Sequence, residues 1–347
     1  MEVMEDRFDN IEMSTHTKDG NIFAEIQSRA LAINKQGILI GLCSKNNPGD
    51  VDEVIKSHPD MQLRDEHITI NKSNWSNKVT NLKEIATELN IGLDSLVFVD
   101  DSSFEVNLIR EQLPEITVLQ VPERLYEYPK MLRENLGLFY NLSLTAEDSK
   151  KIEMYKHLVK RESIKKEFTD IEDYLSSLEL KITIFENDES IIPRMSQMSQ
   201  KTNQFNLTTQ RYTEGDIRNF IDDLDSNVYA FSVADKFGDS GVTGLCIVSD
   251  NSKNESPEID TLLMSCRIIG RNIESAIMDY VMGKIKEKRI GELKAKYIKT
   301  LKNDQVKEFY DKCGFKLVDR DESKINYALS LADYKPRKIK YIEVING

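Results

Sequence analysis

The chain has 347 residues, of which 31% are charged and 39% hydrophobic, and its formal net charge is −12. This composition is typical of a globular protein long enough for two domains, and no apolar run is long enough to span a membrane. The negative charge argues against nucleic-acid binding, which needs a basic face. The first residues show no secretory signal, so we expect a cytoplasmic protein whose four cysteines are reduced thiols.

Residues 22–121 alternate between helical and strand patterns. A helical repeat that contains Ile22, Ile26 and Ile33 ends at Gly37. Apolar runs then predict strands at 38–43, 96–99 and 116–121, with a helix at 78–89. This alternation predicts a parallel sheet whose functional site lies at the carboxyl ends of its strands.

Polar residues stand at the points where these elements meet. Ser44 follows the first strand, Lys78 opens the helix, and Asp100 and Asp101 follow the second strand. A hydroxyl that binds a phosphate, a lysine that offsets its charge, and paired carboxylates that hold Mg²⁺ are the parts of a phosphoryl-transfer site. Each residue alone is equally typical of a turn or a solvated helix end, and only their order along the chain favours a site.

The stretch 258–277 has the pattern of a strand, a short turn and a helix. The turn contains the residues Arg267, Gly270, Arg271 and Asn272. Free backbone N–H groups and the helix dipole favour an anion at such a turn, most simply a phosphate. Cys266 stands at its start. The alternative interpretation is an ordinary strand-to-helix connection with two solvated arginines.

This turn resembles the acetyl-coenzyme-A-binding turn of the GNAT acyltransferase fold, Arg/Gln-x-x-Gly-x-Gly/Ala after a strand. Arg267 and Gly270 match that pattern, whereas Asn272 departs from it at the third position. A second match begins at Asn303 and runs through Phe309 to a Gly-Phe pair at 314–315, in the order of a GNAT C-terminal helix and turn. The resemblance predicts an α+β, GNAT-like second half with Asn303 near its ligand.

Further motifs extend the resemblance to nearly the whole chain. They are Cys-Ser-Lys-Asn-Asn at 43–47, His-Pro-Asp-Met at 58–61, Asn-Trp at 74–75 with Lys78, Leu-Asn-Ile-Gly-Leu-Asp-Ser at 89–95, Val-Asp-Asp at 99–101, Gln-Lys-Thr-Asn-Gln-Phe-Asn-Leu-Thr-Thr at 200–209, and Met-Ser-Cys-Arg-Ile-Ile-Gly-Arg at 264–271. Together they resemble the FkbH-like family, subfamily IIIC of the haloacid dehalogenase (HAD) superfamily, from about residue 5 to 315.

The family resemblance implies a HAD half joined to a GNAT-like half. Its better understood members take a glyceryl group from 1,3-bisphosphoglycerate, remove the phosphate, and load the glyceryl group onto the phosphopantetheine thiol of an acyl carrier protein in polyketide pathways. By this resemblance Cys266 is our hypothesis for the acyl-carrying nucleophile, with Arg267 and Arg271 lowering its pKa and holding a phosphate. The second half has no histidine for a Cys-His pair, and a buried structural cysteine is the alternative. The resemblance also suggests that segment 200–209 orients the substrate through Asn203, Gln204, Asn206 and Thr208.

One motif of the HAD superfamily is absent from the sequence. The Asp-x-Asp that ends the first strand, and that carries the aspartate nucleophile, has no counterpart here. By the resemblance, the missing strand would lie upstream of Met1, or the half has lost its phosphatase chemistry. Loss of the strand should leave its neighbours with an unpaired edge or an apolar patch, which a fragment would expose and an adapted protein should have covered.

These observations predict an α/β protein with three parts. A truncated HAD-like domain of the Rossmann type occupies 1–142, a GNAT-like domain occupies 143–335, and a basic tail follows at 336–347. The predicted function is transfer of a glyceryl-type acyl group from a phosphorylated three-carbon donor to a carrier-protein or coenzyme-A thiol, with Mg²⁺ at Asp100 and Asp101. The alternatives are a phosphatase whose first motif belongs to a longer chain, and a non-catalytic scaffold that binds a carrier protein.

Overall fold

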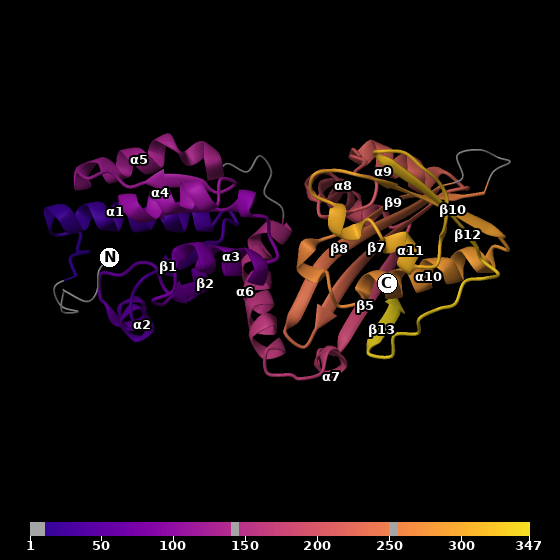
Figure 1. Cartoon of the computed structure of the whole chain (residues 1–347), viewed down its shortest axis with the longest axis horizontal. Coiled ribbons are helices and arrows are strands. Elements are labelled where there is room, and N and C mark those ends of the chain that lie inside the picture. The colour runs from indigo at the N-terminus through magenta and orange to yellow at the C-terminus, as the bar shows by residue number, and fades with distance from the viewer. Residues whose placement is uncertain (1–10, 140–145, 250–255) are drawn as a thin grey trace. The chain divides into compact units, whose positions relative to one another are not determined.

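A computed structural model describes residues 11–139, 146–249 and 256–347 and divides the chain into two compact units, Met1–Ile164 and Lys165–Gly347 (Figure 1). The predicted boundary at 142 lies outside the described residues. The helix that follows it, α6 (Ala146–Lys165), belongs to the first unit, because Tyr155 and Leu158 of this helix are buried in that unit's core. The predicted division therefore differs from the observed one by the length of this helix.

The first unit alternates helices and strands as the sequence predicts. Its remaining elements are α1 (Lys18–Asn34), β1 (Ile40–Ser44), α2 (Pro48–Ser57), β2 (Ile68–Ser73), α3 (Lys78–Glu88), η2 (Leu93–Ser95), β3 (Val97–Asp100), α4 (Ser103–Gln112), β4 (Thr117–Gln120), η3 (Leu125–Glu127), α5 (Tyr128–Glu134) and η4 (Leu136–Phe139). All strand pairs in this unit are parallel, as the alternation of helix and strand requires.

The strands of the first unit form two separate pairs. β1 pairs with β2, and β3 pairs with β4, but within the described residues no backbone ladder joins the two pairs. One hydrophobic core serves both pairs, since Ile70 of β2 and Phe98 of β3 belong to it together. The two pairs are therefore halves of one α/β unit, each with an open strand edge.

Apolar residues of β1 and β3 are more exposed than their sequence predicts. The runs at 38–43 and 96–99 are typical of strands buried on both faces, yet Gly41 is exposed and Val99 is 42% exposed. The apolar face of α1 is also only partly buried at Ile22, Ile26 and Ile33. This pattern agrees with the expected unpaired edge.

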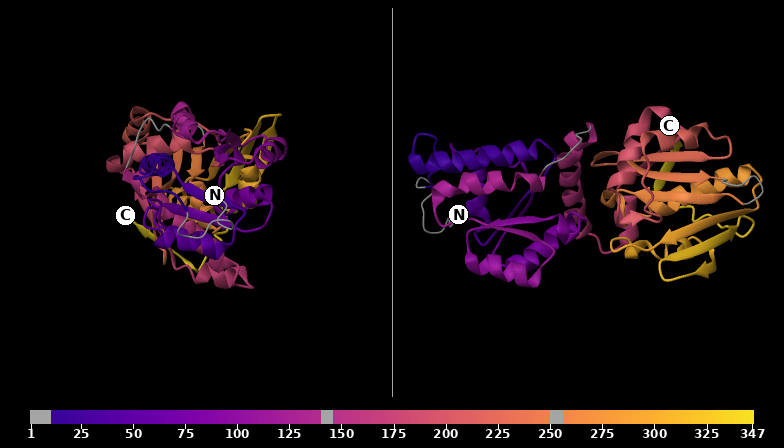
Figure 2. Two further views of the ribbon diagram at one scale, coloured as in Figure 1. Left: turned by 90° about the vertical axis from the view of Figure 1, so that its left-hand side faces the viewer. Right: turned by 90° about the horizontal axis from the view of Figure 1, so that it is seen from above.

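The second unit is organised around one nine-stranded sheet. Its helices and strands are α7 (Ile171–Ser176), β5 (Leu180–Glu186), η5 (Glu189–Ile191), α8 (Ile192–Lys201), β6 (Phe205–Asn206), α9 (Glu214–Asp222), β7 (Asn227–Asp235), β8 (Gly238–Ser249), β9 (Glu258–Met264), η6 (Cys266–Ile268), α10 (Ile273–Glu287), β10 (Glu292–Ile298), η7 (Asp304–Val306), α11 (Phe309–Lys312), β11 (Lys316–Arg320), β12 (Lys324–Ser330) and β13 (Ile342–Asn346). The strand order is β11-β12-β10-β9-β8-β7-β5-β13, with β6 added to β9. The right-hand view of Figure 2 shows these strands side by side.

Helices cover both faces of this sheet, and alternate residues of each strand supply the two cores. On β8, Leu245 and Ile247 pack with α8 and α9, whereas Cys246 and Val248 pack with α10 and α11. This period of two is that of a strand buried on both sides. The predicted α/β fold class is confirmed, with a parallel first unit and a mixed second sheet.

The segment 336–347, predicted as a basic tail, ends in a strand of the sheet. β13 pairs in parallel register with β5, from Ile342 beside Leu180 to Asn346 beside Ile184. β13 gave no strand signal, because it has only five residues, two of them polar, it follows a charged stretch, and only Ile342 in it is buried.

None of the described helices is both long enough and apolar enough to cross a membrane.

The open edges of β1 and β3 give a prediction for hydrogen exchange. Amides of these strands that do not point at β2 or β4 have no ladder partner, so we expect them to exchange orders of magnitude faster than amides of β7, β8 and β9. Residue-resolved hydrogen–deuterium exchange on the full chain measures this difference. Protection of every β1 and β3 amide to the level of β8 would contradict the open edge.

Candidate functional site

A buried ion pair joins two of the predicted residues of the first unit. Lys78 is the first residue of α3, and Asp100 is the last residue of β3. Their Nζ and Oδ2 atoms are 2.6 Å apart, and the two side chains are only 11% and 7% exposed. The other carboxylate oxygen of Asp100 accepts a hydrogen bond from the Ser102 amide at 2.9 Å. The structure thus brings Lys78 and Asp100 together, and both oxygens of Asp100 are engaged.

A second ion pair, which the sequence did not reveal, lies close by. Lys45 Nζ and Glu105 Oε1 are 2.6 Å apart, and the Glu105 side chain is 7% exposed. The Glu105 amide binds the Ser102 hydroxyl at 3.4 Å, as expected at a helix start. Ser102 and Glu105 have the sequence spacing of a capping box, but the Glu105 carboxylate binds Lys45.

Cys43 shows that the two ion pairs form one cluster. Burial raises the pKa of the Cys43 thiol to about 11; Lys78 opposes this rise, and Asp100 and Glu105 add to it. The next residue, Ser44, accepts a hydrogen bond from Asn46 Nδ2 at 3.1 Å. The end of β1 and the end of β3 therefore contribute to the same polar cluster, as the parallel arrangement predicts.

The arrangement of Asp100 and Asp101 does not fit a divalent cation. Asp101 is exposed, whereas Asp100 is buried and bound to Lys78 and Ser102. Within the described ranges, no group of three or more His, Cys, Asp or Glu side chains is placed to hold a metal ion. Magnesium needs oxygen ligands that converge on one point, so we derive no chemical step through Mg²⁺ here.

The turn after β9 has the backbone of a tight connection. Gly270 and Asn272 have φ values of +81° and +61°, in the left-handed region that favours glycine and asparagine. Cys266 begins the short 3₁₀ turn η6 and is half-buried. Asn272 precedes α10 and donates through Nδ2 to the Tyr341 hydroxyl at 2.6 Å. Asn272, the one departure from the GNAT pattern, thus holds the segment that leads into β13.

Arg271 has a structural role in this turn. It is 5% exposed, its Nη1 lies 2.9 Å from Asp235 Oδ2, and its Nη2 donates to the Arg267 carbonyl at 2.7 Å. A guanidinium buried against its own carboxylate and a backbone carbonyl is not placed for a phosphate. Of the two predicted arginines, Arg267 alone is half-buried rather than buried.

The N-terminus of α10 is met by groups of the chain itself. Glu274 lies in the first turn of the helix, where its carboxylate accepts a hydrogen bond from its own backbone N–H. Burial raises the pKa of this carboxyl, while Arg337 and Arg271 lower it. Arg337 also donates to Ser275 Oγ and to the Lys312 carbonyl. The place expected for a phosphate therefore holds a carboxylate and the segment before β13.

The polar residues predicted to bind substrate lie mainly in a buried network. Asn206, Thr208 and Asn303 are each at most 2% exposed. Asn303 Nδ2 donates to the carbonyls of Asn206 and Ile298, both at 2.9 Å. Thr208 pairs with the Thr261 hydroxyl at 2.9 Å. We assign these residues to the fold, because their polar atoms are used within the chain.

The network closes a gap between two strands. β9 and β10 pair only at Glu258–Ile259 with Lys294–Ala295, and β6 then pairs with the far end of β9. Leu207 donates to the Leu262 carbonyl and accepts from the Ile298 amide, at 3.1 and 2.8 Å. The family motif at 200–209 is thus the segment that fills the divergence of β9 and β10. Asn203 and Gln204 lie at its half-exposed beginning, where Asn203 accepts from Arg211.

No protein-family model matches this chain, and no curated protein matches it. Several solved structures match parts of this chain. The N-terminal part of protein BF1531 from Bacteroides fragilis, which contains a phosphatase domain and was determined with Mg, is 38% identical over 41% of this chain, with a TM-score of 0.39. The match spans 37% of that protein's chain.

Other neighbours are N-acetyltransferases. A mutant of the spermidine N-acetyltransferase SpeG from Vibrio cholerae is 11% identical, with 45% of this chain and 97% of that chain covered and a TM-score of 0.35. Ard1 from Thermoplasma volcanium is 20% identical, with coverages of 43% and 97% and a TM-score of 0.34. The neighbours thus include a phosphatase-domain protein and acetyltransferases.

The Lys78–Asp100 pair predicts a large loss of stability in Lys78→Met. Removal of the lysine leaves Asp100 as an uncompensated buried charge, which destabilises by about 3 kcal/mol. Urea unfolding followed by circular dichroism measures this loss. Lys83→Met, at an exposed position of the same helix, is the matched control and should change stability by less than about 0.5 kcal/mol. Equal stability of the two variants would contradict a buried pair.

The raised pKa of Glu274 predicts a pH-dependent gain in Glu274→Gln. In the folded protein the Glu274 carboxyl stays protonated above its ordinary pKa of 4.5. Its contribution to the free energy of unfolding is therefore complete below pH 4.5. That contribution is lost as the pH rises through the pKa that Glu274 has in the folded protein. Glutamine removes that dependence. We expect the variant to gain stability relative to the native chain between pH 4.5 and 7, measured by urea unfolding at each pH. A difference that does not change with pH would refute the assignment.

Proposed function

We propose that the second unit is an acyltransferase in which Cys266 carries the acyl group as a thioester. The acyl group is of the glyceryl type, its donor is a phosphorylated three-carbon acid, and its acceptor is the phosphopantetheine thiol of an acyl carrier protein or of coenzyme A. The resemblance of the sequence motifs to the FkbH-like family supports the substrates, and the placement of the cysteines supports the residue.

The observation that carries the proposal is the contrast among the four thiols. Cys246 and Cys313 are buried, and burial raises the pKa of each to about 12. Cys43 has its pKa raised to about 11. These three are held as unreactive thiols. Cys266, by contrast, is half-buried in the turn that follows β9, with Arg267 next in the chain, so its thiol is the one that this turn presents.

The chemistry proposed for Cys266 has two steps. In the first, the thiolate attacks the acyl carbon of the donor, a C–S bond forms, and the bond from that carbon to the phosphate oxygen breaks with phosphate as the leaving group. In the second, the acceptor thiolate attacks the thioester, and the Cys266 thiolate leaves. The proton of the acceptor thiol goes to solvent, because the last histidine of the chain is His157, in the first unit.

The first unit is not assigned a phosphatase step in this proposal. Lys78 and Asp100 form one ion pair, Lys45 and Glu105 form another, and both oxygens of Asp100 are engaged. An aspartate nucleophile would have to come from a further strand. Phosphatase activity of a longer chain that supplies this strand remains the alternative function of this unit.

The second unit has a second candidate function, which is to bind a carrier protein without catalysis. It is favoured by the closed divergence of β9 and β10, where β6 leaves no strand edge for an extended ligand to pair with. This candidate predicts binding of a carrier protein without turnover of any acyl donor.

Intact-protein mass spectrometry tests the thioester directly. After incubation with 1,3-bisphosphoglycerate we expect a covalent phosphoglyceryl adduct on the native chain, sensitive to hydroxylamine, because a thioester is cleaved by that nucleophile. The adduct should be absent from Cys266→Ala. A mass lower by one phosphate would reveal dephosphorylation by the first unit.

Cys43→Ala is the matched control, because Cys43 is also half-buried but has a raised pKa. It should keep the adduct in full. Retention of the adduct in Cys266→Ala would overturn the assignment of the nucleophile, and no adduct on any folded variant would favour the carrier-binding role.

A further inference from the structure

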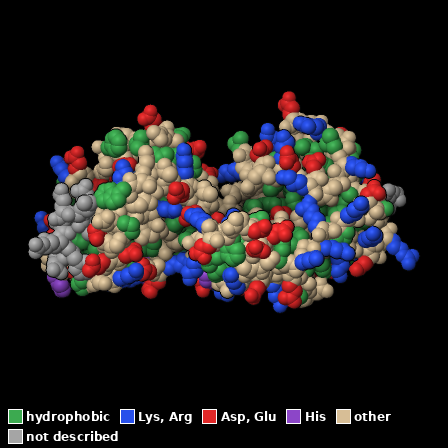
Figure 3. Space-filling view, turned by 60° about the horizontal axis from the view of Figure 1, so that its bottom comes forward, with side chains coloured by type: hydrophobic (Ala, Val, Ile, Leu, Met, Phe, Trp, Pro, Cys, Tyr) green, Lys and Arg blue, Asp and Glu red, His purple; other side chains and the backbone are tan. Residues whose placement is uncertain are grey.

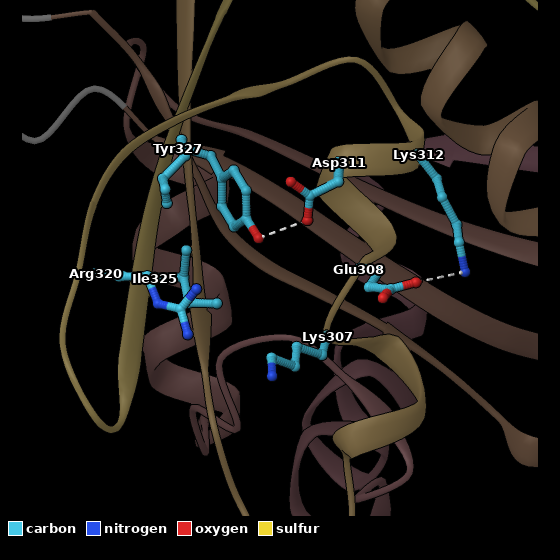
Figure 4. A pocket seen from close by; sticks show the side chains of 8 residues that line it. Lys307, Glu308, Asp311, Lys312, Arg320, Ile325 and Tyr327 are labelled. Atoms are coloured by element: carbon cyan, nitrogen blue, oxygen red, sulfur yellow. Dashed lines mark hydrogen bonds and ion pairs between the residues drawn. The ribbon is translucent and has the colours of Figure 1, made fainter.

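The second unit contains a cavity that none of the predicted site residues lines. It has a volume of about 560 Å³ and is lined by Lys307, Glu308, Asp311, Lys312, Leu317, Arg320, Ile325 and Tyr327. The segment η7–α11 forms one side, and the strands β11 and β12 form the other (Figure 4). The volume lies within the range of small-molecule sites, which is about 300–1,000 Å³. We call this cavity the α11 pocket.

The inner wall of the α11 pocket is rigid and partly apolar. Ile325 and Tyr327 of β12 are 8% and 2% exposed, so both side chains are fixed by the core behind them. The Tyr327 hydroxyl donates to Asp311 Oδ2 at 2.8 Å, and burial together with this carboxylate raises the pKa of the phenol. A ligand would therefore meet a neutral tyrosine beside an aliphatic surface.

Both carboxylates that line the pocket already have partners. Asp311 accepts from Tyr327, and Glu308 pairs with Lys312 one helical turn later at 3.4 Å. Figure 4 shows both contacts as dashed lines on the α11 side. Asp311 keeps its negative charge, so the pocket is lined by three cations and two carboxylates.

Two cationic side chains of the pocket, Lys307 and Arg320, form no ion pair within the described residues. In the part of the chain that the structure describes, no carboxylate forms an ion pair with Lys307 or Arg320, the one half-buried and the other exposed. Arg320 is near enough to the phenol of Tyr327 to act against the rise of its pKa. In Figure 4 the two cationic side chains extend into the same part of the pocket, below Tyr327. Two like charges so placed favour an anion between them.

The part of the sequence that contains the pocket residues carries an excess of positive charge. Residues 284–347 contain 17 Lys and Arg against 10 Asp and Glu, although the whole chain has a net charge of −12. Figure 3 shows Lys and Arg side chains over the surface of the second unit. An excess of one sign in a segment raises the local concentration of ligands of the opposite sign.

We propose that the α11 pocket binds a small anionic molecule, with its phosphate or carboxylate group between Lys307 and Arg320 and its remaining atoms against Ile325 and Tyr327. Arginine suits this role, because its planar fork binds phosphate or carboxylate oxygens in pairs. The concave shape and the size of the pocket favour a small molecule over a flat protein surface. The site shares no residue with the turn at Cys266 and does not depend on the proposed acyl transfer.

Isothermal titration calorimetry of the full chain at constant ionic strength tests the site with three probes. These are inorganic phosphate, 3-phosphoglycerate and citrate. We expect at least one of them to bind saturably, with one site per chain. The affinity should fall about tenfold in Arg320→Met and in Lys307→Met. Each substitution removes one charged hydrogen bond of about 1.5 kcal/mol or more. Preference for the phosphates or for citrate identifies the head group.

Lys312→Met is the matched control, because it removes a cation from the same pocket that Glu308 already neutralises. It should leave the affinity within about twofold, as should Cys266→Ala. All the substituted side chains are at least partly exposed, and circular dichroism verifies their folding. Equal losses of affinity in Lys312→Met and Arg320→Met would show that the anion is attracted by the general positive charge and not by a specific site, and would contradict the proposal. Loss in Cys266→Ala, or no saturable binding by the native chain, would overturn the proposal.

Discussion

Each β-strand has N–H and C=O groups along two edges, and these groups need partners wherever water does not reach them. The two units of this protein meet that constraint in opposite ways. In the second unit, β6 enters the divergence of β9 and β10, and β13 pairs with the edge of β5. In the first unit, β1 and β3 each keep an open edge, although one core lies behind both strand pairs.

The side chains at the strand ends also differ between the two units. The cluster at the strand ends of the first unit contains two ion pairs, Lys78 with Asp100 and Lys45 with Glu105. The first pair joins α3 to β3, and the second joins the residue after β1 to α4, so both pairs stabilise the packing of this unit. In the second unit, Cys266 is half-buried just after β9, a strand in the interior of the sheet, so the scaffold is fixed where the nucleophile is proposed.

The sequence predicted much of the fold and less of the site. Long apolar runs and helical repeats located β1, α3 and β3 within a few residues. Side-chain partners were harder to predict, because they depend on residues distant in sequence. Arg271 looked like a phosphate ligand until Asp235, 36 residues earlier, proved to neutralise it. Asn206 and Asn303 are 97 residues apart, and nothing in either segment reveals that they bind each other.

The same reasoning explains where an anion can bind in the second unit. A helix N-terminus favours negative charge. In the first turn of α10, however, the Glu274 carboxyl is buried and the Ser275 hydroxyl accepts a hydrogen bond from Arg337. At the α11 pocket the situation is reversed, because the carboxylates are bound elsewhere and Lys307 and Arg320 keep their charge. Anion recognition and the proposed nucleophile are therefore separated within this unit, and an acyl phosphate that reaches Cys266 must be held mainly by its acyl part and by Arg267.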